Sequence, residues 1–163
     1  MRRAWFILLV SLALGLAALV PGALAASPAT TAGGGSLAVR GANGALVVTG
    51  QGVIFGYFDQ GSLYVFNYDP SAASDAISVE GATARNGSGV TLYSGSQVRF
   101  LIPAGSYTVE LVGSDIDVSA VGRGMINVSA HANVSTGWIA LDGGRPASFS
   151  RVSVPASFGG VSP

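Results

Sequence analysis

Residues 37–68 read LAVRGANGALVVTGQGVIFGYFDQGSLYVFNY, a series of short β-branched and aromatic runs broken by turn signals. Asn43-Gly44 separates two of these runs, and Asp59-Gln60-Gly61 separates the next two. Asn-Gly favours a two-residue turn with positive φ, and Gly61 suits a left-handed position. No window of helical length repeats apolar residues at i, i+3 and i+4. The stretch therefore predicts antiparallel strands joined by tight hairpins.

The same punctuation continues through the rest of the chain. Pro103-Ala104-Gly105 and Gly122-Arg123-Gly124 each divide two apolar runs, and Asp142-Gly143-Gly144 follows the run GWIAL. With about 10–12 candidate short strands, we expect an all-β, mostly antiparallel fold, either a sandwich or a small closed barrel. A β-solenoid is the alternative architecture. It requires a fixed repeat, whereas the spacing of the turn signals drifts.

The N-terminus has the pattern of a signal peptide. Arg2 and Arg3 precede an apolar run from Ala4 to Val20, Pro21-Gly22 breaks a helix, and Ala23-Leu24-Ala25 supplies the small residues of a cleavage site. We therefore expect a signal helix followed by a secreted or extracytoplasmic domain, with no stable membrane insertion after cleavage. A retained N-terminal anchor is the alternative, because the run approaches the ~18–20 residues that span a bilayer.

Composition divides the chain into four parts. The segment ASPATTAGGGS after the leader is small, polar and rich in glycine, which is typical of a flexible linker. The expected division is a signal peptide at 1–25, a linker at 26–36, a single β domain at 37–155 and a C-terminal tail at 156–163.

Charge and cysteine content exclude several classes of function. The chain has no cysteine, so disulfides and thiolate metal sites are excluded. All eight basic residues are arginines, and they face eight acids. Removal of Arg2 and Arg3 leaves a net charge of −2 (6 − 8). A chain with so few cations lacks the basic footprint that nucleic-acid binding needs. The abundance of Ala, Gly and Arg beside the absence of lysine indicates a GC-rich bacterial source.

Catalytic signatures are missing from the sequence. No nucleophile elbow or phosphate-binding loop occurs, and no cofactor is expected. Gly50-Gln51-Gly52 lies inside an extended run, where we expect its glycines to let backbones approach closely. His131 is the single histidine, and its neighbours favour a turn. We therefore assign no catalytic residue.

Two acids are the most suggestive polar pair. On a strand, Asp115, Asp117 and Ser119 would share one face while Ile116 and Val118 face inward. The two carboxylates are candidates for a metal site, with calcium as the cation that hard oxygen ligands suit. The alternative, which we favour, is a charged outer face that discourages edge-to-edge pairing.

An aromatic strand is the second candidate site. Tyr64, Phe66 and Tyr68 alternate and would share a face, with Leu63 and Val65 on the buried one. Such a row can stack against sugar rings or apolar ligands. The alternative is a central strand buried on both faces, which the apolar run at 53–58 favours.

One further aromatic residue and one pattern complete the sequence features. Trp138, in GWIAL, is predicted to anchor the core. Most of residues 37–141 resemble a strand-and-turn pattern of uncharacterised secreted all-β proteins of GC-rich bacteria. The most recognisable part is Ser119-Ala120-Val121-Gly122-Arg123-Gly124, at the end of the segment 93–124. The resemblance implies an exported all-β domain and carries no activity.

Together these features predict an exported, non-enzymatic β domain with a structural or binding role at or beyond the cell surface. The partners to consider are a cell-wall glycan or another surface protein. The alternative is a secreted carbohydrate-active hydrolase that uses paired carboxylates. Its acids would come from the following set: Glu80, Glu110, Asp115 and Asp117.

Overall fold

The computed structural model describes residues 34–72, 76–128, 134–149 and 155–160. The expected signal peptide, most of the expected linker and His131 lie outside the described residues. Within the described ranges, no helix is both long and apolar enough to cross a membrane.

The fold is all-β and antiparallel, as expected. Its strands are β1 (Gly35–Pro70), β2 (Ser78–Gly87), β3 (Val90–Val128), β4 (Thr136–Leu141), β5 (Ala147–Ser148) and β6 (Ala156–Phe158). They form one sheet in the order β2-β3-β1-β4-β5, and β6 pairs with β3. β1 and β3 are 36 and 39 residues long, far longer than an ordinary strand of about 5–6 residues.

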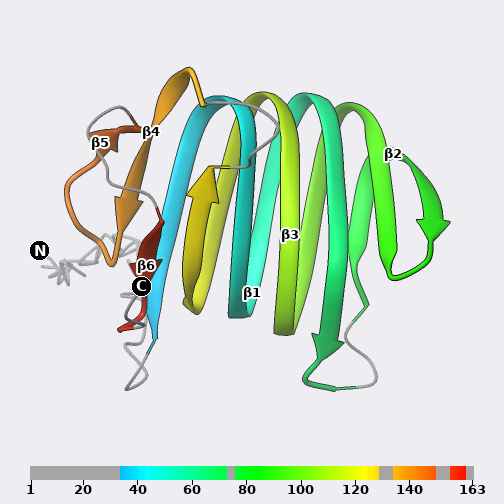
Figure 1. Cartoon of the computed structure of the whole chain (residues 1–163), viewed down its shortest axis with the longest axis horizontal. Helices are drawn as coiled ribbons and strands as arrows, with labels where there is room; N and C mark the ends of the chain where they lie inside the picture. Colours follow the sequence, from blue (N-terminus) through cyan, green and yellow to red (C-terminus); the bar gives the residue numbers. More distant parts are fainter. Residues whose placement is uncertain (1–33, 73–75, 129–133, 150–154, 161–163) are drawn as a thin grey trace, which may run out of the picture.

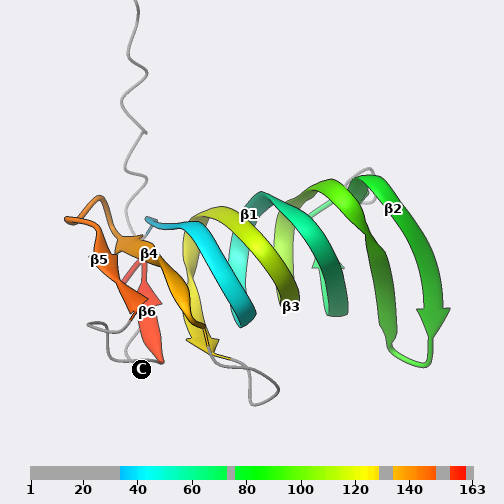
Figure 2. The same cartoon turned by 90° about the horizontal axis from the view of Figure 1, so that it is seen from above.

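These two long strands wind around a common axis (Figures 1 and 2). Leu46 of β1 pairs with Leu111 on one side and with Val128 on the other. These two partners lie 17 residues apart in β3 (128 − 111), so β1 runs between successive turns of its partner. The winding leaves β2 at one end of the coil and β4, β5 and β6 at the other (Figure 1). The sheet is not closed into a barrel.

Each turn of the coil is flattened, so the sheet forms two facing layers. Layer A contains residues 36–43, 53–60, 96–104 and 114–121 together with β4 and β5. Layer B contains residues 45–51, 62–69, 90–94, 106–112 and 123–128 together with β6.

Glycines mark the bends at which a strand passes from one layer to the other. One row across the strands consists of Gly95, Gly61, Gly113 and Gly44, and the other of Gly105, Gly52, Gly122 and Gly35. At the second row, a Cβ on Gly52 would overlap the Val121 carbonyl oxygen, and one on Gly122 would overlap that of Gln51. Both glycines have positive φ, at 132° and 141°. Only glycine fits such a bend without strain.

The core lies between the layers and follows the alternation of strand residues. Ile116, Val118 and Ala120 are buried, and Asp117 and Ser119 between them are not. This part of the sequence prediction is confirmed. The largest fully buried side chains come from both layers: Leu37, Leu46, Ile54, Phe58, Leu63, Ile102, Leu111, Ile116, Ile126 and Phe158. Each contributes about 1.5–3 kcal/mol relative to an exposed position.

The expected hairpins are wrong at four of the five turn signals. Gly44 and Gly61 lie inside β1, and Gly105 and Gly122 lie inside β3. The chain does not reverse at these glycines. It bends and continues on the opposite layer, so the sheet has two long strands in place of 10–12 short ones. The expected closed barrel is wrong for the same reason.

The turn at Asp142-Gly143 is confirmed. It joins β4 to β5, with both residues at positive φ. The Asp142 side chain also accepts hydrogen bonds from the backbone N–H of Ser36 and Gly159, both at 3.0 Å. It thereby ties the start of β1 to the chain that follows β6. β6 itself falls in the expected C-terminal tail, and Phe158 docks it because the ring is fully buried.

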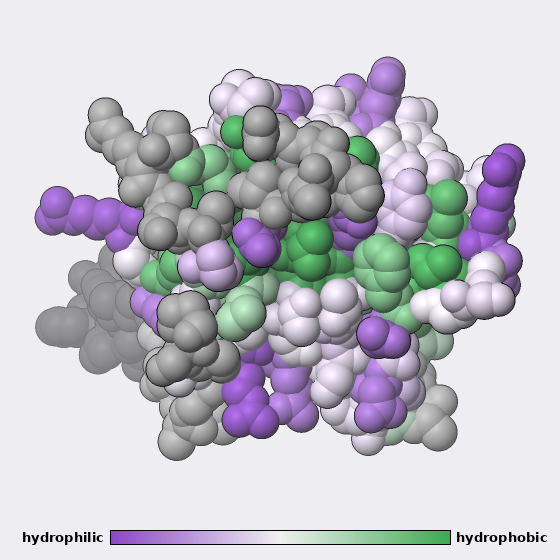
Figure 3. Space-filling view, viewed as in Figure 1, coloured by the Kyte–Doolittle hydropathy of each residue, from purple (hydrophilic) through white to green (hydrophobic). Residues whose placement is uncertain are grey.

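Apolar residues are not confined to the core. On the face seen in Figure 3, hydrophobic patches lie between hydrophilic side chains that project mainly at the periphery. The large apolar residues with the most exposed surface are Phe55, Phe66, Leu101, Val121 and Trp138.

Candidate functional site

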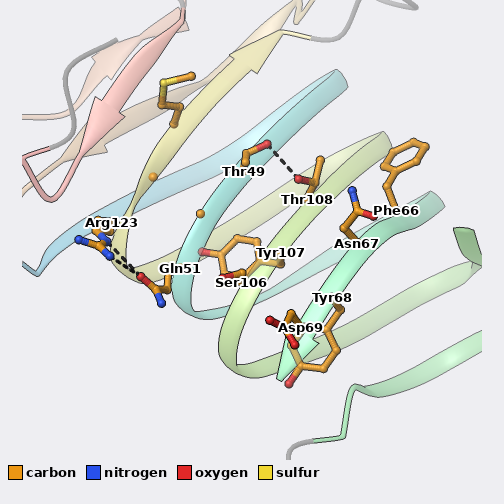
Figure 4. A pocket seen from close by; sticks show the side chains of 13 residues that line it. Thr49, Gln51, Phe66, Asn67, Tyr68, Asp69, Ser106, Tyr107, Thr108 and Arg123 are labelled. Carbon is orange, nitrogen blue, oxygen red and sulfur yellow. Dashed lines mark hydrogen bonds between the residues drawn. The ribbon is translucent and has the colours of Figure 1, made fainter. Parts of the chain in front are cut away.

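A groove of about 740 Å³ lies against the outer side of layer B. It is lined by Thr49, Gly50, Gln51, Phe66, Asn67, Tyr68, Asp69, Ser106, Tyr107, Thr108, Arg123, Gly124 and Met125. Figure 4 shows that these residues come from neighbouring segments of β1 and β3. The groove is therefore built on paired strands, which hold side chains more rigidly than loops do.

Strand register arranges the lining residues in two cross-strand rows. The first row is Met125, Thr49, Thr108 and Asn67, and the second is Arg123, Gln51, Ser106 and Asp69. Neighbours in such a row lie about 5 Å apart. The winding brings together residues that are up to 76 positions apart in sequence (125 − 49).

Hydrogen bonds connect part of each row (Figure 4). Arg123 donates to Gln51 Oε1 from Nε at 3.1 Å and from Nη2 at 2.7 Å. Thr49 Oγ1 and Thr108 Oγ1 lie 3.4 Å apart. No hydrogen bond joins the exposed side chains of Asn67 and Asp69 to another described residue. Arg123 and Asp69 place opposite charges at the two ends of one row.

A bulge in β1 changes the expected aromatic face. Val65 pairs with Val109 and Asn67 pairs with Thr108, which leaves Phe66 as an extra residue. Phe66 is 38% exposed, and its ring stacks on that of Tyr64 with centroids 6.2 Å apart and planes 13° apart.

Beyond the bulge the alternation is reversed, so the expected row of three aromatics is wrong. Tyr68 pairs opposite buried Tyr107 and packs against the core. Tyr64 and Phe66 remain together outside, while Leu63 and Val65 are buried as predicted. The interpretation that both faces of this strand are buried is wrong for Phe66.

Tyr107 lies beneath the groove and was not singled out from the sequence. Only 2% of its surface is exposed, and its hydroxyl has no hydrogen-bond partner among the described residues. The absence of a side chain on Gly50 makes room for that hydroxyl, because a Cβ there would lie 3.1 Å from it. Burial raises the pKa of Tyr107 to about 12.

The acidic pair lies on the other side of the molecule, on layer A. Asp117 accepts a hydrogen bond from the Gly41 N–H at 2.8 Å and lies 4.0 Å from Arg40 Nε. The backbone N–H of Asp115 donates to Asn43 Oδ1, and Asp115 has a φ of 51°. Among the described residues, no three histidine, cysteine or acidic side chains gather into a metal site. The Asp117 carboxylate therefore already interacts with the Arg40 guanidinium and with the Gly41 N–H.

The four acids of the hydrolase alternative do not converge. Asp115 and Asp117 belong to layer A, and Glu80 of β2 pairs with Arg99 at the edge of that layer. Glu110 belongs to layer B, where 7% of it is exposed. The core of the coil separates the two groups.

The prediction that Trp138 anchors the core is wrong. The ring is 38% exposed, and Ile139 beside it is buried instead. The Arg40 guanidinium lies over the indole, 6.0 Å from the ring centroid. Strand alternation accounts for the difference, because only one of two neighbouring residues can face the core.

Comparison with known proteins returned no matching family, curated protein or solved structure. The resemblance of most of residues 37–141 to secreted bacterial proteins therefore stays a prediction. Within this pattern, Arg123 lines the groove, and Gly122 belongs to a glycine row.

Proposed function

We propose that the protein is an exported, non-enzymatic binding module that holds a hydroxyl-rich ligand, a segment of cell-wall glycan, in the layer B groove. The observation that carries the proposal is the pair of cross-strand rows, which present hydroxyl, amide, carboxylate and guanidinium groups over one continuous surface.

The chemistry of the rows suits sugar hydroxyls, which both donate and accept hydrogen bonds. Asn67 offers a donor and an acceptor, Asp69 offers acceptors, and Arg123 retains N–H groups beyond those that hold Gln51. Opposite charges at the ends of one row favour a ligand without a large net charge.

Phe66 supplies the apolar part of the site. Its stacked partner Tyr64 fixes the ring at the side of the groove, where it can contact the C–H face of a sugar. A flat ring held in place loses little conformational entropy when a ligand binds.

Binding is a better proposal than hydrolysis for this groove. A glycosidase needs two carboxyl groups about 5–9.5 Å apart on either side of the bond it cleaves. Asp69 is the single acid in the groove lining. The groove can orient a glycan, and its lining offers no acid–base pair to cleave it.

The test is a screen of the purified protein on an array of neutral and acidic oligosaccharides, followed by calorimetric titration of the best soluble one. Asn67→Ala and Arg123→Ala each remove hydrogen-bonding groups, so we expect affinity to fall about 5–100-fold. Phe66→Ala should weaken binding by a similar factor.

Phe55→Ala is the matched control, since Phe55 is an exposed phenylalanine on layer A. It should leave the affinity for a monovalent oligosaccharide unchanged. Failure of every oligosaccharide to bind, or an equal loss in Phe55→Ala, would contradict the proposal.

A further inference from the structure

The outer face of layer A exposes an apolar patch on paired strands. Phe55 is 46% exposed, Leu101 beside it 43%, and Val121 52%. Phe55 pairs with Leu101 on one side and Ser119 on the other, and Val53 pairs with Val121. An exposed cluster of this kind on a sheet marks an interaction surface.

A row of alternating charge runs beside this patch. Across the strands the order is Arg40, Asp117, Tyr57, Arg99, Glu80. Trp138 flanks the row at its Arg40 end. Two cations and two anions make the row itself neutral. Asp59 and Asp115 lie near Tyr57 as further anions, so the face does not attract an anionic membrane.

If a second copy of the row is reversed about Tyr57, each cation of one row falls opposite an anion of the other. A twofold axis along the middle strand, residues 53–60, would place Arg99 of one copy against Asp117 of the other, and Glu80 against Arg40. A twofold axis that runs across the strands would instead place each charged residue opposite the same residue of the second copy. The twofold axis that matches the charges also places Phe55 of one copy against Phe55 of the other, and Leu101 of one copy against Ser119 of the other.

We propose that this face is a dimer interface, in which two copies of the chain stack layer A on layer A about the 53–60 strand. A twofold interface buries the same patch on both copies, which a self-complementary face allows. Asp59 lies two residues beyond Tyr57 on the same strand and would approach its own copy across the axis, a like-charge contact that weakens the dimer.

The size of the face sets the expected strength. Five strand segments spaced about 4.8 Å apart give a width of roughly 20 Å. The eight residues of segment 53–60 span roughly 26 Å at about 3.3 Å each, so the face measures roughly 500 Å², less than the roughly 800 Å² per partner of a standard stable interface. We therefore expect a dissociation constant in the micromolar range.

Charge-swap variants test the register of the dimer. E80R/R99E exchanges two neighbours within one chain, so it keeps the net charge and the cross-strand pair. In the dimer it creates like-charge contacts with Asp117 and Arg40 of the second copy. Sedimentation velocity should show at least about a 100-fold weaker dimer.

A second variant, R40E/D117R, exchanges the other half of the row and should also be monomeric. Mixed one to one, the two variants restore every opposite-charge contact, so a heterodimer should form. This rescue distinguishes the proposed register from general loss of solubility or folding.

Phe55→Ser tests the apolar part and needs no change to Arg40, whose side chain also bonds backbone carbonyls. It should abolish the dimer, and Phe66→Ser on layer B should not. A wild-type chain that stays monomeric up to about 100 µM overturns the proposal. So does a mixture of folded variants that stays monomeric. Glycan binding in the groove would survive either result.

Discussion

The two layers share one backbone winding, yet their outer faces differ. Layer B is hollowed, because short polar side chains such as Thr49 and Ser106 lie between the longer Phe66 and Arg123 at its outward positions. Layer A carries large or charged side chains such as Phe55 and Arg40 at its outward positions. Glycine rows and inward apolar residues are common to both. The winding therefore fixes where side chains point, and the choice of outward residue decides what each face can bind.

The largest expected effect comes from the bends that create both layers. Gly52→Ala should lower the free energy of unfolding by more than about 4 kcal/mol, because its Cβ would overlap the Val121 carbonyl at a φ that alanine avoids. Thermal or urea unfolding measures the loss.

Gly89→Ala is the control for this change. Gly89 also has a positive φ, of 75°, but no atom lies within 4 Å of an added Cβ. Its cost should be about 1 kcal/mol. Equal losses in the two variants would mean that the strands do not approach closely at the glycine row.

The next effect compares the two sides of one strand in layer A. Ile54 is fully buried and Phe55 is 46% exposed. Ile54→Ala should cost about 2–5 kcal/mol, and Phe55→Ala about 0.5 kcal/mol or less, measured by urea unfolding at a concentration where the chain is monomeric. A larger loss at Phe55 would contradict the alternation of the strand.

A third effect is a loss of stability at alkaline pH, which we expect from Tyr107 beneath the layer B groove. Its folded pKa of about 12 exceeds the ordinary value near 10, so the unfolded chain loses this proton first as pH rises. The stabilisation is fully present below pH 10 and is lost as pH approaches 12. The loss should be about 2–3 kcal/mol.

Tyr107→Phe should remove this alkaline slope and change stability near pH 7 by no more than about 0.5 kcal/mol, since the hydroxyl has no partner among the described residues. Urea unfolding between pH 8 and 12 makes the comparison. An unchanged slope in the variant would show that Tyr107 is accessible to water.

The smallest effect concerns the bulge that gives layer B its aromatic edge. A double-mutant cycle of Tyr64→Ala and Phe66→Ala should give a coupling of about 0.5–1 kcal/mol from the stacked rings. Zero coupling would indicate that Phe66 is not held beside Tyr64.

Local sequence patterns predicted the class of fold and the orientation of many side chains. β-branched runs identified strands, and alternation placed Ile116 and Val118 inside and Asp117 outside. The same alternation failed at Tyr68, because a bulge at Phe66 adds one residue that no local pattern reveals.

The path of the chain was the larger error. Asn43-Gly44 favours a turn. In the structure, however, Gly44 pairs with Gly113 from a distant segment, so the glycine permits a close approach of two strands and not a reversal of the chain. The signal was present as glycines recurring every 8–10 residues along β1 and β3. The groove could not be predicted, since pairing of Gln51 with Arg123 depends on the winding.

Cysteine cross-linking tests the winding most directly, because the chain has no cysteine of its own. Thr49 pairs with Thr108 on one side and Met125 on the other, so T49C/T108C and T49C/M125C should each form a disulfide in the folded protein. A hairpin at Asn43-Gly44 would instead bring Arg40 opposite Val47, and R40C/V47C should stay reduced. Oxidation of the R40C/V47C pair alone, with neither Thr49 pair closing, would contradict the account.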